Sequence, residues 1–130
     1  MLDTHEEGFV NSFVASIRKD RFRTLLASRR RRVLLQHLAH PHDLEWGYAT
    51  KLPRWVSTPE EICALLRLKG APLSCHVISE SAEIDGLEMP LDHALSRIVG
   101  YGMASFLSCI PGRLGYLESE ESGERFIFLR

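Results

Sequence analysis

The sequence is poor in cysteine, lacks any long apolar run and carries almost no net charge. Its three cysteines, Cys63, Cys75 and Cys109, are an odd number at irregular spacing, which excludes a disulfide framework. No run of about 18 apolar residues is present, so we expect neither a membrane-spanning helix nor a membrane partner. The first residues are acidic where a signal peptide would be basic, and a cytoplasmic, reducing location is therefore expected.

Motifs of several common enzyme and nucleotide-binding families are also missing. The chain contains no Gly-x-Gly-x-x-Gly, no Walker phosphate-binding loop and no Gly-x-Ser-x-Gly, and no motif attaches it to a known family. Its composition is ordinary for a globular domain, with 45% hydrophobic and 25% charged residues. A length of 130 residues fits one domain, so residues 1–130 are predicted to form a single globular domain.

The first third of the chain is predicted to be helical. Phe9, Phe13 and Ile17 recur at a spacing that places them on one face of a helix. Ser28 is typical of a helix N-cap, because its hydroxyl can accept a hydrogen bond from a free backbone N–H of the first turn. A separate helix is therefore expected over about residues 29–40, and Pro41 is expected to end it.

Two later helices and a run of strands are expected in the remainder. The sequence Thr58-Pro59-Glu60-Glu61 is a capping box, and Pro90 marks a second helix start. A turn at Pro111-Gly112 is expected to join two strands, because proline sets φ and glycine accepts the positive φ of a type II turn. The predicted strands are Ser74–Ser79, Ser105–Ile110, Leu114–Glu118 and Arg125–Leu129.

This order of elements predicts an α+β fold. N-terminal helices are expected to pack on a mostly antiparallel sheet with a C-terminal β-meander, because helices and strands occur in separate runs. The last strand is apolar on both faces, which is typical of a strand that is covered on both sides. The expected core is Phe13, Ile17, Leu25, Leu34, Leu38, Leu65, Leu66, Val77, Leu95, Ile98, Phe106, Leu107, Tyr116, Phe126 and Phe128.

Charge is segregated along the chain. Residues 1–60 hold ten lysines and arginines against seven aspartates and glutamates, and residues 61–130 hold six against ten. The basic residues concentrate in the segment Arg18–Arg32, which makes nucleic acid one candidate partner. A sequence pI of about 6.6 is low for such a protein, and a solvated helix face with some arginines paired to the acidic C-terminal half is the plainer interpretation. The candidate partner-binding or phosphate-binding residues are Arg29, Arg30, Arg31 and Arg32.

Three histidines lie close together in the sequence. His37, His40 and His42 are followed by Asp43, and three imidazoles with a carboxylate could bind zinc or another transition metal. Their spacing matches no established metal motif. The alternative is a helix C-terminus in which partly protonated imidazoles interact favourably with the helix dipole.

Cys109 and the aromatic residues of the middle segment are further candidates. Cys109 could be a catalytic nucleophile if a nearby cation lowered its pKa, but a free cysteine is more often a small buried hydrophobic residue. Trp46, Tyr48 and Trp55 could line a pocket, or they could tether a long irregular segment by packing.

The favoured function is a non-catalytic module that binds a protein or a small ligand. No catalytic set of residues stands out, and segregated charge would steer a charged partner or allow head-to-tail self-association. This interpretation needs no cofactor. The alternatives are a metal-binding protein or enzyme that uses His37, His40 and His42, and a nucleic-acid-binding protein that uses Arg18–Arg32.

Overall fold

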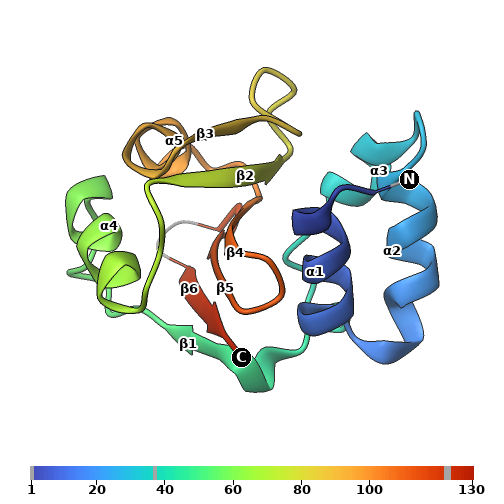
Figure 1. Cartoon of the computed structure of the whole chain (residues 1–130), viewed down its shortest axis with the longest axis horizontal. Coiled ribbons are helices and arrows are strands. Elements are labelled where there is room, and N and C mark those ends of the chain that lie inside the picture. The colour runs from blue at the N-terminus through green and yellow to red at the C-terminus, as the bar shows by residue number, and fades with distance from the viewer. Residues whose placement is uncertain (1, 37, 122–123) are drawn as a thin grey trace.

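The computed structural model describes residues 2–36, 38–121 and 124–130, and these residues form three layers. A sheet lies in the middle, with helices on both of its faces (Figure 1). Within the described residues the sheet has six strands in the order β1-β6-β5-β4-β2-β3, and every neighbouring pair is antiparallel. The strands are β1 (Ala49–Lys51), β2 (Ser74–Ser79), β3 (Glu88–Pro90), β4 (Ser105–Ile110), β5 (Leu114–Glu118) and β6 (Arg125–Leu129).

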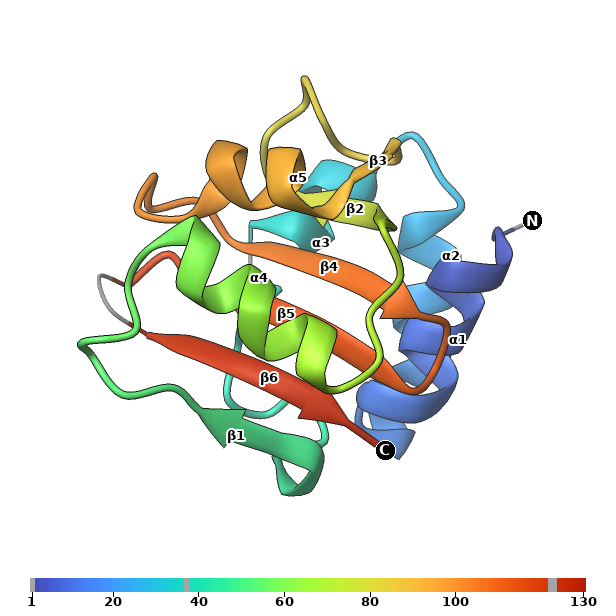
Figure 2. The ribbon, with the colours of Figure 1, turned by 60° about the vertical axis from the view of Figure 1, so that its left-hand side comes forward.

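The helices fall into an N-terminal and a later group, and each group covers one face of the sheet. The N-terminal group lies on one face, and α4 and α5 lie on the other, as the turned view in Figure 2 also shows. The helices are α1 (Thr4–Phe13), α2 (Lys19–Leu26), α3 (Arg31–Leu35), α4 (Pro59–Leu68) and α5 (Leu91–Ile98), with short 3-10 turns η1 (Ser16–Arg18) and η2 (Trp46–Tyr48). The predicted α+β class is confirmed. Among the described residues, no helix is both long and apolar enough to cross a membrane.

The C-terminal meander follows the prediction closely. β4, β5 and β6 have the predicted bounds, and Gly112 in the first turn has a φ of 69°. On β6, Ile127 belongs to the core beneath α4 and α5, whereas Phe128 belongs to the core beneath α1 and α2. The two apolar faces of this strand are therefore both covered, as expected.

The capping box of α4 is also confirmed. The Thr58 hydroxyl accepts a hydrogen bond from the Glu61 backbone N–H at 3.2 Å, and the Glu61 carboxylate accepts one from the Thr58 backbone N–H at 3.3 Å. Hydrogen bonds from Thr58 also lower the pKa of the Glu61 carboxyl. These local bonds satisfy backbone donors at the helix start without help from the rest of the fold.

Two details of the N-terminal helices differ from the sequence-based expectation. Ile17 was expected in the core but is 85% exposed, because α1 ends at Phe13 and the extended Val14 forms a β-bridge with Leu44 before η1 begins. The helical spacing is therefore interrupted before Ile17. The expected helix over 29–40 is reduced to α3, and Leu38 beyond it donates its N–H to the carbonyl of Leu35 at 3.4 Å, three residues back rather than four.

The rest of the predicted core is mostly correct. Leu25, Leu65 and Phe126 are half-buried, and the other predicted members apart from Ile17 are buried. Two clusters of apolar side chains result, one on each face of the sheet. The loop end of the meander, after β5 and before β6, lies beside η2, and this neighbourhood contains the candidate site described next.

Candidate functional site

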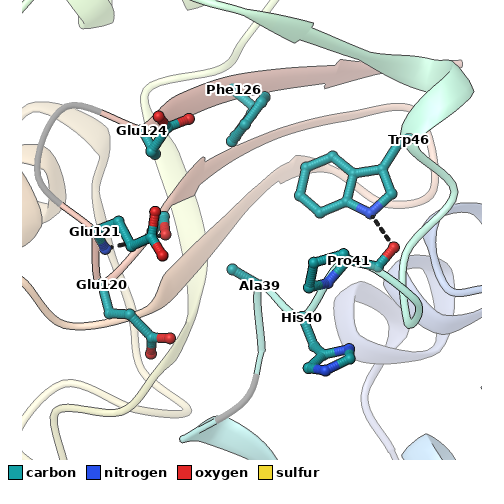
Figure 3. Close-up of a pocket in the computed structure, with 9 residues that line it drawn as sticks. Ala39, His40, Pro41, Trp46, Glu120, Glu121, Glu124 and Phe126 are labelled. Carbon is teal, nitrogen blue, oxygen red and sulfur yellow. Dashed lines mark hydrogen bonds between the residues drawn. The ribbon is translucent and has the colours of Figure 1, made fainter.

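A pocket of about 380 Å³ opens between η2, the segment before it and the β5–β6 turn. Glu120, Glu121 and Glu124 stand along one side, and Trp46 and Pro41 face them from the other (Figure 3). The pocket therefore combines an aromatic wall with a row of carboxylates. The remaining lining residues are Ala39, His40, Ser119 and Phe126.

The aromatic wall is held in place by packing and by one hydrogen bond. The indole N–H of Trp46 donates to the carbonyl of Pro41 at 2.8 Å (Figure 3). Its ring packs against Phe126 with centroids 4.9 Å apart and an angle of 66° between the planes, and against Phe128 at 5.6 Å. Because both phenylalanines lie on the inner strand β6, the indole is attached to the sheet and cannot rotate freely.

The acidic wall comes from the turn between β5 and β6. The backbone N–H of Glu121 donates to the Ser119 hydroxyl at 3.1 Å, and that of Glu124 donates to the Glu121 carbonyl at 3.2 Å. The Glu124 carboxylate forms an ion pair with Lys51 of β1 at 2.8 Å. Glu120 and Glu121 are exposed and form no ion pair with any described residue. The pocket therefore carries uncompensated negative charge.

This arrangement favours a cation as ligand. The face of an indole attracts a guanidinium or an ammonium, and carboxylates on the opposite wall would accept its hydrogen bonds. The indole N–H is already used by Pro41, so it is not available to a ligand.

The predicted histidine cluster lies partly beside this pocket. His40 lines the pocket, and the backbone N–H of His42 donates to its Nδ1 at 3.3 Å, with the two rings 5.4 Å apart. Both residues are exposed, and Asp43 forms an ion pair with Arg18 at 3.3 Å. His37 lies outside the described residues. Metal binding by these three histidines therefore stays a prediction.

A second polar cluster, which we call the clasp, joins α1, α3 and β2. It consists of Asp3, Glu6, Arg31, His76 and Asp85. The Arg31 guanidinium donates two hydrogen bonds to Glu6, at 2.6 and 2.8 Å, and two to Asp85, at 2.7 and 2.9 Å. His76 lies between Glu6 and Asp3, with Nε2 2.7 Å from Glu6 and Nδ1 3.0 Å from Asp3.

Charge neutralisation inside the clasp keeps the buried Glu6 ionised. Burial by itself opposes the charged carboxylate, but hydrogen bonds from His76 and Arg31 lower the pKa of Glu6 to about 2. Beside it, the His5 ring stacks on His76 at 5.6 Å, and its Nδ1 lies 2.7 Å from the Ser108 hydroxyl. Burial and the neighbouring His76 lower the pKa of His5, which favours its neutral form.

Among the described residues, Asp3, Glu6 and His76 are the one set of side chains with ligand atoms close enough to share a metal ion. Their geometry does not favour one ion. The two nitrogens of His76 point to different carboxylates, and an ion at either nitrogen would be separated from the second carboxylate by the ring. Arg31 also occupies both oxygens of Glu6. The clasp is therefore best explained as a structural ion-pair network.

The clasp divides the predicted arginine run. Arg31 points inward and pairs with two carboxylates, Asp85 from the acidic C-terminal half and Glu6 from the N-terminal half. Arg29, Arg30 and Arg32 are exposed, and none of them forms an ion pair with a described residue. Three arginines therefore remain available to a partner.

The remaining candidates from the sequence are Cys109, Tyr48 and Trp55, and none of them lines the pocket. Cys109 is 2% exposed, and burial raises the pKa of its thiol, which disfavours the thiolate that a nucleophile requires. Tyr48 packs edge-on against Phe13 with centroids 6.4 Å apart, so it tethers the middle segment. Trp55 is 79% exposed, and of the three middle aromatics only Trp46 lines the pocket.

No protein-family model, curated protein or solved structure matches this chain. The site therefore has to be interpreted from its own residues. Sequence reasoning identified Trp46 as a possible pocket residue, but it did not place it opposite the glutamates of the β5–β6 turn. It missed the clasp, because sequence positions give no signal that Glu6 and Asp85 meet at Arg31 or that Asp3 meets His76.

Proposed function

We propose that the protein is a non-catalytic binding module and that its pocket accepts a positively charged group of a protein partner or small ligand. The observation that supports this proposal is the position of the Trp46 ring opposite Glu120, Glu121 and Glu124. A guanidinium fits best, because it is planar, stacks on aromatic faces and donates hydrogen bonds to carboxylates in a fixed fork.

The free energies that such contacts contribute indicate a weak and salt-sensitive interaction. A cation over an exposed aromatic ring contributes roughly 0.5–1 kcal/mol. Each exposed ion pair adds about 0–1 kcal/mol and is screened by salt. Binding of a single cationic group would therefore be modest, and useful affinity would require several groups to bind together.

The fluorescence of Trp46 provides a direct test. The Trp55→Phe variant leaves Trp46 as the only tryptophan, and N-acetyl-arginine amide would be titrated into it at low salt. We expect a saturable change in emission that weakens as salt is added. N-acetyl-citrulline amide is the matched ligand control, because it has nearly the same shape without the charge and should produce no comparable change.

Charge-removing variants connect the signal to the pocket. Glu120→Gln/Glu121→Gln should weaken binding several-fold, whereas Glu60→Gln/Glu83→Gln removes two exposed charges elsewhere and should leave it unchanged. Equal binding of the arginine and citrulline compounds, or equal loss in both double variants, would contradict the proposal.

Nucleic-acid binding remains a second proposal, supported by the exposed side chains of Arg29, Arg30 and Arg32. A labelled oligonucleotide that does not bind at low salt would remove it, because phosphate contacts are strongest there. The cytoplasmic location also remains a prediction.

A further inference from the structure

The exposed arginines form the strongest charged surface feature that the pocket does not explain. We call Arg29, Arg30 and Arg32 the arginine turn. The backbone of the turn is anchored at two points, because the Ser28 hydroxyl accepts from the Arg30 backbone N–H at 3.0 Å and Arg31, between Arg30 and Arg32, is held in the clasp. The neighbouring Val33 is 41% exposed. The three guanidinium groups are thus displayed on a fixed backbone.

A hollow lies between α3, which includes Arg32 of the arginine turn, and the pocket. This hollow of about 290 Å³ is lined by Val33 and Leu34 of α3 and by His40, and His40 also lines the pocket. The hollow is therefore bordered by Val33, which directly follows Arg32, and by His40, which belongs to the pocket.

We propose that the cationic ligand of the pocket is the arginine turn of a second copy of this chain, and that two copies form a two-fold symmetric dimer. This inference rests on the proposed function, because it names the partner of the same pocket. The exposed arginines would face Glu120 and Glu121, which form no ion pair with a described residue, and the planar guanidinium of one arginine would stack on Trp46.

Symmetry explains why a two-fold dimer is favoured over the head-to-tail association expected from the sequence. When complementary patches lie on one stretch of surface, a two-fold axis brings each arginine turn to the other copy's pocket at the same time. The weak contact is then made twice, and the assembly closes. The net charge of −1 adds little repulsion between copies.

Charge reversal provides a test that a non-specific effect would not imitate. One variant is Glu120→Arg/Glu121→Arg, and the other is Arg29→Glu/Arg32→Glu. Each variant alone would place like charges opposite each other and should be monomeric. In an equimolar mixture both contacts would again join opposite charges, so the mixture should form a heterodimer. Circular dichroism and thermal unfolding would show that both variants are folded.

Sedimentation equilibrium is the measurement, with the wild-type protein followed over a range of concentrations. We expect a monomer–dimer equilibrium at about 0.01 M salt that shifts to monomer near 1 M, where screening is nearly complete. A wild-type protein that stays monomeric at low salt, or folded variants that fail to associate when mixed, would overturn the dimer. If that protein still bound N-acetyl-arginine amide, the proposed function would stand and this inference alone would fail. A monomer that binds an oligonucleotide through the arginine turn would also overturn it, in favour of nucleic acid.

Discussion

Arg31 and Glu6 form a two-pronged ion pair that joins α3 to α1, with nitrogen–oxygen distances of 2.8 and 2.6 Å. The same guanidinium holds Asp85 from the loop after β2, so a single side chain connects three segments that are distant in the sequence. Glu6 is 5% exposed, and its charge depends on this pairing. Ion pairs therefore hold α1 to the rest of the fold in addition to its apolar contacts with the sheet.

Replacing Glu6 with glutamine should destabilise the protein at neutral pH and reduce its acid sensitivity. The folded-state pKa of Glu6 is lowered from 4.5 to about 2, so its charge stabilises the fold above pH 4.5, and this stabilisation is lost as the pH falls towards 2. The shift corresponds to at most about 3 kcal/mol. Urea unfolding of the variant and the wild type at pH 7, 5 and 3 would measure how the difference in their free energies of unfolding depends on pH.

The control for this prediction is Glu83→Gln, which removes an exposed carboxylate paired with Arg97 at 2.9 Å. Its effect should be within about 1 kcal/mol at every pH, as for other surface ion pairs. A Glu6→Gln variant whose stability difference from wild type is the same at pH 7 and pH 3 would contradict the role given to the carboxylate.

Replacing Arg125 with methionine should cost about 3–5 kcal/mol, because it leaves a buried carboxylate unpaired. The Nε of Arg125 donates to Glu118 at 3.0 Å, and Glu118, which is 3% exposed, also accepts from the Tyr116 hydroxyl and from the Gly100 backbone N–H. Thermal unfolding would show the loss. Lys51→Met, which breaks the partly exposed pair with Glu124, is the control and should cost much less.

Replacing Gly8 with alanine should destabilise the fold, although alanine favours a helix by about 1 kcal/mol. A Cβ at position 8 would lie 2.6 Å from the Gly112 backbone nitrogen and 2.9 Å from the Pro111 carbonyl carbon, which are backbone atoms that cannot easily move. We expect a net loss of roughly 1–3 kcal/mol in urea unfolding. Gly47→Ala meets nothing within 4 Å and should be nearly neutral, so equal stability of the two variants would contradict the close approach.

The buried thiols should be unreactive in the folded protein. Burial raises the pKa of Cys75 to about 12 and also raises that of Cys109. In a Cys63→Ala variant, both remaining thiols should react with a disulfide reagent in urea but only very slowly without it. Rapid reaction of the native protein near neutral pH would instead support a nucleophilic role for Cys109.

The sequence alone determined the local structure of this protein well. The capping box at Thr58 and the turn at Pro111-Gly112 depend on residues that are neighbours in the chain, so their conformations can be predicted from residue type. The meander strands were found at their observed bounds for the same reason. Prediction was wrong at Ile17, where a β-bridge between Val14 and Leu44 interrupts the helical spacing.

Only the tertiary structure decided which distant residues meet. Periodicity marks which face of an element is buried, but it does not specify the partner of a charged side chain. The pairing of Arg31 with both Glu6 and Asp85, and the approach of Trp46 to Glu120, depend on how two helical layers pack across one sheet. The run of four arginines is uniform in sequence, yet packing turns Arg31 inward and leaves its neighbours exposed, because Arg31 is the member of the run that faces Glu6 and Asp85.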